Sequence, residues 1–175
     1  MRSERTKQSE IDRQLASAWL LATAAAAFLA LNDAIPRALA THPALARALH
    51  PIGYAVYLAV GLVVLEHAWR RKAWIRPLGA SALAAAMAFL IKAVTLVPRP
   101  SIAAGLSYAG SSFPSAHAAV AASLLPSTQN RWMQLALIAI IISRLCVHHP
   151  LDIVAGIAIG LGWNGILQPY AAGKA

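Results

Sequence analysis

Six apolar stretches, separated by short polar or proline-containing segments, constrain the fold of this chain more than any other feature. They cover residues 15–31, 52–65, 77–97, 114–125, 133–147 and 150–170. A helix that spans a bilayer needs about 20 mostly apolar residues, and soluble domains seldom contain so many such runs. The composition agrees, because 59% of the 175 residues are hydrophobic and only 12% are charged. The pattern predicts an all-α polytopic membrane protein, a six-helix transmembrane bundle.

The length suits one domain, residues 1–175. Residues 1–14 are charged, and we expect them to form a cytoplasmic tail that leads into a retained first helix and not into a cleaved signal peptide. The prolines between residues 32 and 51 predict a loop there, with a short surface helix within residues 38–49. The single cysteine, Cys146, excludes an internal disulfide and a multi-cysteine metal site, and it is interpreted as a packing residue.

The net charge of +9 is also explained by a membrane location. The basic residues lie mostly in loops and termini without a continuous face of interleaved aromatic residues, which argues against a nucleic-acid partner. With the N-terminus inside and six spans, ten of the 15 lysines and arginines fall on the cytoplasmic side and five on the other. This distribution follows the positive-inside rule, so the predicted partner is the lipid bilayer.

Three polar stretches lie at the predicted extracytoplasmic ends of the helices. Their ionisable or helix-starting residues are, in order, Lys92 and Arg99; Pro114, Ser115, Ala116 and His117; and Arg144, His148, His149 and Asp152. Ionisable groups in apolar surroundings are costly to desolvate, so they are usually paired and often functional. Because all three stretches face the same side, we expect them to meet at one phosphate.

Transfer of a phosphoryl group needs cations, amide donors, a nucleophile and an acid for the leaving oxygen. Lys92, Arg99 and Arg144 can supply the positive charge, the arginines in bidentate fashion. Ser115 lies at a predicted helix start, where free N–H groups and the helix dipole favour an anion. Two neighbouring hydroxyls, Ser111 and Ser112, are weaker candidates for the same role.

Two histidines can divide the remaining chemistry, one attacking phosphorus and the other protonating the leaving oxygen. His148 and Asp152 are four residues apart and share a face if a helix begins near them. A carboxylate that holds one imidazole nitrogen leaves the other bare to attack. Asp152 is the only clearly placed carboxylate, so a two-metal site is not expected and no cofactor is required.

In order and spacing, these residues resemble the three-part signature of the type-2 phosphatidic acid phosphatase superfamily: Lys92-x6-Arg99-Pro100, Pro114-Ser115-x-His117 and Ser143-Arg144…His148-x3-Asp152. That family comprises membrane lipid phosphatases and, more distantly, vanadium haloperoxidases. The resemblance covers the third to sixth apolar stretches. It implies that His148 is the nucleophile, Asp152 its orienting partner and His117 the general acid.

The resemblance also implies that Lys92, Arg99, Ser115, Arg144 and the backbone around Ala116 bind the phosphoryl group. The chain departs from the family pattern in two places. Ala116 stands where the family usually has glycine, although a small residue is kept. Only three residues separate Arg144 from the first histidine, where the family usually has five, which puts the role of Arg144 in question. The spacing to Asp152 is retained and favours His148 over His149 as nucleophile.

The sequence therefore predicts a metal-independent lipid phosphatase at the extracytoplasmic face of a bacterial-type inner membrane, acting through a phosphohistidine. Undecaprenyl diphosphate is the substrate favoured by analogy with the family. Phosphatidylglycerophosphate, phosphatidic acid and the lipid A 1-phosphate stay open, as does phosphate transfer between lipids. A different class, a non-catalytic anionic-lipid binder or small transporter, would depend on the cations and be indifferent to the two histidines.

The fourth apolar stretch adds an expectation about depth. His117 and Arg131 are fourteen residues apart. That separation corresponds to about 21 Å of helix, against a hydrocarbon core of about 30 Å. If Arg131 lies at the inner interface, the site is recessed below the outer one.

Overall fold

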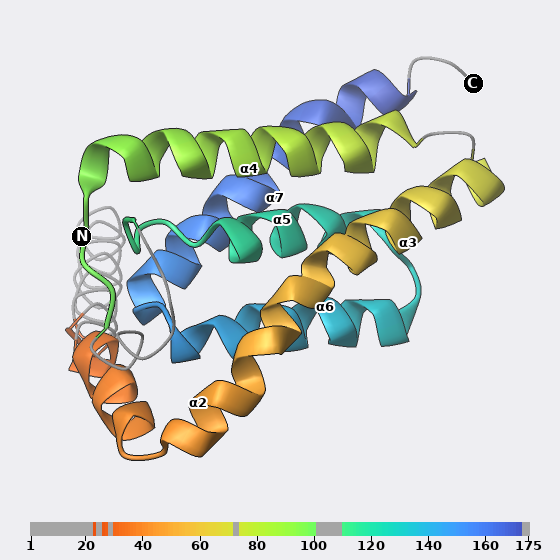
Figure 1. Cartoon of the computed structure of the whole chain (residues 1–175). Coiled ribbons are helices and arrows are strands. Elements are labelled where there is room, and N and C mark those ends of the chain that lie inside the picture. Colours follow the sequence, from red (N-terminus) through yellow and green to blue (C-terminus); the bar gives the residue numbers. More distant parts are fainter. Residues whose placement is uncertain (1–22, 24–25, 28–29, 72–73, 101–109, 173–175) are drawn as a thin grey trace, which may run out of the picture.

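The computed structural model describes residues 23, 26–27, 30–71, 74–100 and 110–172 of the chain (Figure 1). Every regular element among them is helical, which confirms the predicted all-α fold. The α-helices are α2 (Pro43–Leu49), α3 (Ala55–Arg71), α4 (Ile75–Thr95), α5 (Ala116–Leu124), α6 (Arg131–Ser143) and α7 (Pro150–Ala172). Short 3-10 turns join them: η1 (His50–Tyr54), η3 (Leu125–Ser127) and η4 (Arg144–Cys146).

Helix α5 is the centre of the bundle. It contacts α3, α4, α6 and α7, and Figure 1 shows it between α4 and α6 with α3 crossing in front. Four of its alanines have no solvent-exposed surface at all: Ala118, Ala119, Ala121 and Ala122. Alanine favours the helix and loses no side-chain entropy on burial. A short, alanine-rich helix can therefore be surrounded closely by four others.

The closest packing is between α5 and α7. A Cβ atom added at Gly156 would lie 2.5 Å from the Ser115 carbonyl oxygen, and one at Gly160 would lie 2.1 Å from that of Ala119. These two glycines are four residues apart, so they lie on one face of α7 and let the two backbones approach. The seam brings the N-termini of both helices together, and the Ser115 N–H donates to the Asp152 carbonyl at 2.8 Å.

The other helices bury stripes of small or aliphatic residues against this centre. On α4 the residues Ala80, Ala84 and Ala88 recur every fourth position with no exposed surface. Leu137 of α6 and Val63 of α3 are also fully buried in the core around α5. Each such larger side chain contributes roughly 1.5–3 kcal/mol on burial.

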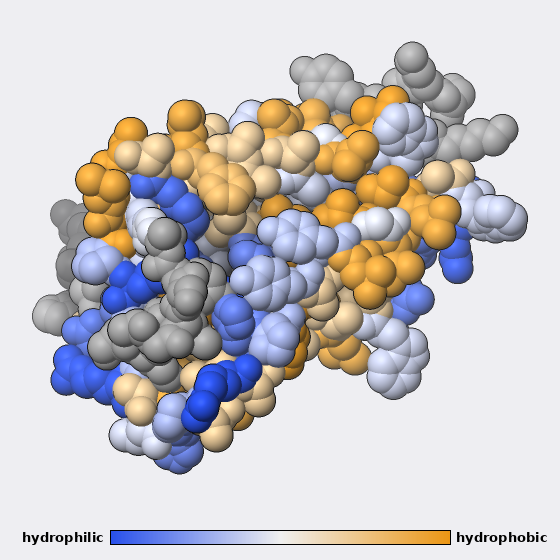
Figure 2. Space-filling view, viewed as in Figure 1, coloured by the Kyte–Doolittle hydropathy of each residue, from blue (hydrophilic) through white to orange (hydrophobic). Residues whose placement is uncertain are grey.

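The outer surface is apolar, as expected of a membrane bundle. Within the part of the chain that the structure describes, three segments are long and apolar enough to cross a bilayer: Pro43–Arg70, Ile75–Thr95 and Pro150–Gln168. Large side chains such as Leu90 and Val94 of α4 are mostly exposed, at 66% and 77%. Figure 2 shows hydrophobic residues along α4 and α3, with the hydrophilic ones gathered toward the end where α2 lies. The predicted class of membrane bundle is confirmed.

Two details of the predicted helices are corrected. Residues 32–40 are helical, so the loop predicted there is wrong, whereas α2 (Pro43–Leu49) agrees with the short helix predicted within residues 38–49. Pro43 and Pro51 occupy first-turn positions of α2 and η1, where a missing N–H costs nothing. Helices α5 and α6 have only 9 and 13 residues, so neither crosses a bilayer by its own length. Most of the predicted first span, residues 15–31, lies outside the described residues.

Candidate active site

A cavity of about 400 Å³ opens where the end of α4 meets the starts of α5 and α7. Six of the eight residues predicted for the site line it: Lys92, Arg99, Ala116, His117, Arg144 and His148. The other described lining residues are Phe89, Ala93, Leu96, Gly110 and Ser111. Three of these eleven are cations and none is acidic. Such a cavity suits an anion that carries an apolar group.

Lys92 and Arg99 are held by backbone carbonyl groups of the segments around them. The Lys92 Nζ donates to the carbonyl oxygens of Ser111 at 2.8 Å and Ser112 at 2.9 Å. The Arg99 guanidinium lies 3.3 Å from the Val147 carbonyl oxygen and 3.5 Å from that of Ser111. These carbonyl groups fix the direction of the two side chains, which both line the cavity.

Arg144 is 1% exposed and reaches the cavity from η4. Its Nη1 donates to the His50 carbonyl oxygen at 3.4 Å. A Cβ atom at Gly53 would lie 1.8 Å from the same Nη1, so η1 covers the guanidinium and any side chain at this position would displace it. The tight 3-10 turn lets Arg144 and His148 share one cavity despite the shortened link between them.

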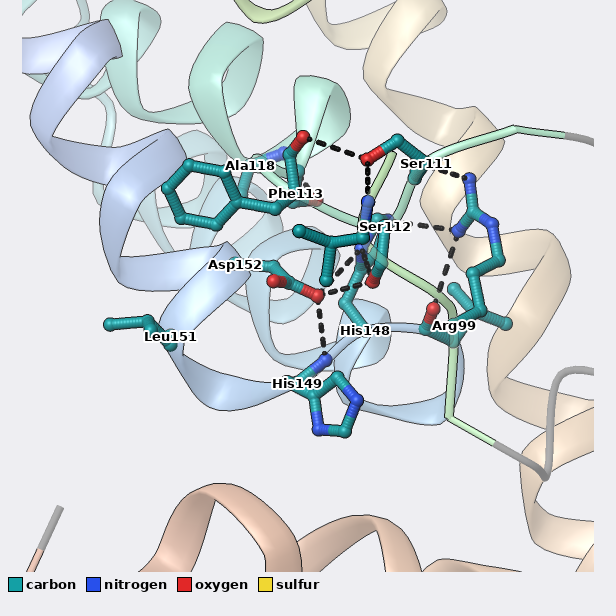
Figure 3. Close-up of polar contacts among 12 residues, drawn as sticks. Arg99, Ser111, Ser112, Phe113, Ala118, His148, His149, Leu151 and Asp152 are labelled. Carbon is teal, nitrogen blue, oxygen red and sulfur yellow. Dashed lines mark hydrogen bonds and ion pairs between the residues drawn. The ribbon is translucent and has the colours of Figure 1, made fainter. Parts of the chain in front are cut away.

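His148 and Asp152 face each other at the start of α7 (Figure 3). The His148 Nδ1 lies 3.5 Å from the Asp152 Oδ2, which also accepts the His149 N–H at 2.9 Å. Asp152 is the third residue of α7, so it caps the first turn as well as facing the imidazole. The other imidazole nitrogen, Nε2, lies 3.4 Å from the Arg99 Nη1. Nε2 is therefore the nitrogen on the side of the cations.

The surroundings of His148 favour the neutral imidazole. Burial lowers the pKa of His148 to about 4, and the charges of Arg99, Lys92 and Arg144 act in the same direction. The hydrogen bond to Asp152 opposes them. A histidine with this pKa is uncharged at pH 7, which is the form that can attack phosphorus.

His117 is the second residue of α5 and lies on the same cavity. Its Nε2 is buried and has no hydrogen-bond partner among the described residues. The rings of Tyr54 and Tyr57 contact the imidazole edge-on, with centroids 5.7 and 5.8 Å away. These contacts fix the ring while leaving the nitrogen available to a bound group.

Ser115 does not line the cavity. Its side chain is fully buried and accepts the Ala118 N–H at 3.4 Å as the N-cap of α5. Ala116, the first residue of α5, does line the cavity. The first N–H groups of a helix have no intrahelical partner, so this end of α5 can receive an anion. A direct role of Ser115 in phosphate binding stays a prediction.

His149 points away from the cavity (Figure 3). Its Nδ1 lies 3.2 Å from the Asn32 carbonyl oxygen, in the segment before α2. Cys146 has no exposed surface, and its Sγ donates to the Ser143 carbonyl at 2.9 Å, which fits a packing residue. Both observations agree with the expectations from the sequence.

Sequence reasoning did not find the supporting contacts that η1 and α3 make with two of the lining residues. Gly53, Tyr54 and Tyr57 carry no charge and belong to no motif, yet they hold Arg144 and His117. Among the described residues no cluster of three or more His, Cys, Asp or Glu could hold a metal ion. The groups gathered at this site are cations and imidazoles.

The structure is similar to a solved crystal structure described as the first transmembrane PAP2 type phosphatidylglycerolphosphate phosphatase from Bacillus subtilis. The match has a TM-score of 0.66 and covers 90% of this chain and 94% of the other, at 20% sequence identity. The chain has the fold of a PAP2-type membrane phosphatase. No protein-family model matches the sequence, and no significant match was found among curated proteins.

PAP2 abbreviates type-2 phosphatidic acid phosphatase, the family whose signature the three polar stretches resemble. Motif spacing and backbone shape are independent observations, because the fold comparison covers nearly the whole chain and not the motifs alone. Both lead to the same PAP2 architecture.

Proposed function

We propose that this protein is a lipid phosphatase of the PAP2 type that works without a metal ion. The observation that carries the proposal is the cavity itself. It combines three cations, a buried neutral imidazole and a second imidazole with a bare nitrogen. A simple anion-binding site needs the cations but has no use for two histidines in these states.

In the first step the Nε2 of His148 attacks phosphorus. The N–P bond forms as the bond to the leaving oxygen breaks. The negative charge of the bound phosphate favours a protonated His117, which gives its proton to that oxygen. Lys92, Arg99 and Arg144 stabilise the negative charge on the phosphoryl oxygens in the transition state. Asp152 stabilises the positive charge that develops on the His148 ring.

In the second step water hydrolyses the phosphohistidine. His117, now neutral, accepts a proton from the water as its oxygen attacks phosphorus and the N–P bond breaks. Inorganic phosphate leaves and both histidines return to their starting states. Replacing water by the hydroxyl of a second lipid would give phosphate transfer, so the same site supports both reactions.

We propose undecaprenyl diphosphate as the preferred substrate. Its two phosphates are directly linked, so their charge fits within one compact cavity that holds three cations. The apolar side chains of Phe89, Ala93 and Leu96 lie on the α4 side of that cavity, where α4 also exposes Leu90 and Val94 to the bilayer. A single prenyl tail can leave the cavity along this side. We also propose that the site faces the extracytoplasmic side of an inner membrane, because the distribution of lysines and arginines in the sequence follows the positive-inside rule.

Phosphatidylglycerophosphate is a second candidate. The similar crystal structure is described as a phosphatidylglycerolphosphate phosphatase, and the two chains share nearly their whole length. The two phosphates of phosphatidylglycerophosphate are separated by glycerol, so only the terminal phosphate would occupy the cavity. Phosphatidic acid and the lipid A 1-phosphate also present a single terminal phosphate and belong in the same test.

The test is phosphate release by purified protein in detergent with EDTA present, using each of these four lipids. We expect turnover that survives EDTA and is highest with undecaprenyl diphosphate. His148→Ala should abolish release while lipid binding persists, because the cations stay in place. His149→Ala is the matched control and should keep parental turnover.

Each other outcome has a definite meaning. Loss of activity in His149→Ala and not in His148→Ala would assign the nucleophile to the neighbouring residue. Loss in EDTA, restored by a divalent cation, would contradict the metal-independent mechanism. Binding of the lipids without release from any of them would move the protein to the class of anionic-lipid binders and transporters.

A further inference from the structure

Ser112 lies in the segment between α4 and α5, outside the residues that define the three motifs. Its side chain is fully buried. Its hydroxyl lies 3.2 Å from the His148 Nδ1 and also donates to the Asp152 Oδ2 (Figure 3). Ser112 therefore contacts both members of the pair that orients the proposed nucleophile, from an element that contains neither.

The distances favour a path through this serine. The direct separation of 3.5 Å between the His148 Nδ1 and the Asp152 Oδ2 is longer than an ordinary N–H···O hydrogen bond. A hydroxyl can accept one hydrogen bond and donate another at the same time. The His148 Nδ1–H can donate to the Ser112 Oγ, and the Ser112 O–H donates to the carboxylate.

The backbone of Ser112 fixes this hydroxyl in place. Its N–H donates to the Val97 carbonyl at 2.7 Å, and its own carbonyl accepts from the Lys92 Nζ at 2.9 Å. One residue thus connects a phosphate-binding cation, the imidazole and its carboxylate. Movement of the segment would disturb all three together.

We propose that Ser112 is a positioning residue that holds the His148 proton on Nδ1 and keeps Nε2 bare toward the cavity. This inference rests on the proposed function for its catalytic meaning, but the tautomer that it specifies can be measured separately. During attack the N–P bond forms at Nε2 and the bond to the leaving oxygen breaks. The Nδ1 proton and the Ser112 proton both stay where they are, and Asp152 offsets the ring charge through the serine.

The kinetic test compares Ser112→Ala with Ser81→Ala. Ser81 is also a buried serine, but it lies on α4, its hydroxyl donates to the Pro77 carbonyl at 2.7 Å, and it does not line the cavity. Loss of a group that orients a ligating histidine typically costs about 10- to 100-fold, and we expect a similar loss of kcat in Ser112→Ala. Because the cations are untouched, inhibition by vanadate should stay parental. Ser81→Ala should keep most of the parental kcat.

The spectroscopic test is the ¹⁵N NMR signal of His148, isolated by subtracting the spectrum of His148→Ala from that of labelled parent protein. We expect the Nδ1–H tautomer in the parent and in Ser81→Ala, and a mixture or the Nε2–H tautomer in Ser112→Ala. An unchanged tautomer in Ser112→Ala would overturn the proposal. So would a kcat in Ser112→Ala no lower than in Ser81→Ala.

The two tests separate this inference from the proposed function. If the parent protein releases no phosphate from any lipid, the proposed function fails. The NMR signal still reports whether Ser112 sets the tautomer of His148.

Discussion

The two ends of the bundle both bury polar side chains where α4, α5 and α7 meet, but they use them differently. At the end opposite the cavity, Asn164 donates to the Ser123 carbonyl at 2.6 Å and the Ser127 hydroxyl at 2.9 Å. Its amide oxygen accepts from Arg76 at 2.5 Å. Both ends of this amide are occupied within the protein, so its hydrogen bonds contribute to stability.

At the cavity end three cations converge, and the one nearby carboxylate, Asp152, is turned toward His148 and Ser112. Like charges gathered in a poorly hydrated place oppose folding. A bound anion would offset that cost. The comparison teaches that buried polar groups which satisfy one another stabilise the fold, whereas several like charges gathered at one cavity mark a candidate site.

The largest effect that would sharpen this comparison is expected from Arg99→Ala. Loss of one cation that stabilises the transition state should lower kcat/KM by about 100- to 1,000-fold. The melting temperature should stay equal or rise, because repulsion with Arg144 is removed. Phosphate-release kinetics and thermal melting in detergent measure the two quantities. The control is Arg131→Ala, at the exposed start of α6, and a matching kinetic loss there would contradict the assignment.

The opposite end should give the opposite result. Asn164→Ala leaves buried partners on Ser123 and Ser127 unsatisfied, which costs about 1–3 kcal/mol of stability. Activity per folded molecule should change little, because the cavity lies at the other end of the helices. Melting experiments measure the loss, with the exposed Gln129→Ala as control. A large fall in kcat without a change in melting would break the comparison between the two ends.

A smaller and more specific effect is expected from Gly53→Ala. The new methyl group would displace the Arg144 guanidinium, so we expect weaker vanadate inhibition and a higher KM, by about tenfold or about 1.4 kcal/mol. Gly61→Ala on α3 meets no atom within 4 Å and is the matched control. In an Arg144→Ala background the Gly53 change should have no further effect. If the effects of Gly53→Ala and Arg144→Ala on KM simply add, Gly53 acts through a residue other than Arg144.

The smallest effect concerns pH. The pKa of His148 is lowered to about 4, so activity should fall on the acid side only as pH approaches that value and the nucleophile gains a proton. Arg99→Gln removes one charge that lowers this pKa, so the acid limb of kcat/KM should move to higher pH. Parent and variant are compared on the same lipid, which cancels titration of the substrate. An acid limb of kcat/KM at the same pH in parent and variant would show that protonation of His148 does not cause it.

Most of the fold and the identities of the candidate residues follow from the sequence. Apolar runs locate α3, α4 and α7 to within a few residues, because a membrane helix must be both long and apolar. The charges at Lys92, Arg99 and Arg144 are visible because they interrupt such runs. The segment from 32 to 51 was predicted only in part, since prolines that begin a helix look the same as prolines that end one.

The supporting contacts could not be read from the chain. Gly53 matters only because Arg144, some ninety residues later, packs against it, and nothing near Gly53 marks the contact. Ser112 was considered only as a weak hydroxyl donor for phosphate, because its distance from His148 depends on how three helices pack. The tyrosines beside His117 appear in sequence as ordinary apolar residues of a membrane span.

The alanine and glycine seam between α5 and α7 has a consequence for how such a chain can diverge. What must be preserved there is the absence of any side chain at Gly156 and Gly160 of α7 and of side-chain atoms beyond a methyl group on α5, and that requirement fixes only a few positions of the sequence. The lipid-facing positions, by contrast, accept almost any apolar residue. Most positions of such a chain can therefore change while the two helix ends that carry His117 and Asp152 keep their positions relative to each other. This tolerance is compatible with a fold that two chains share at 20% sequence identity.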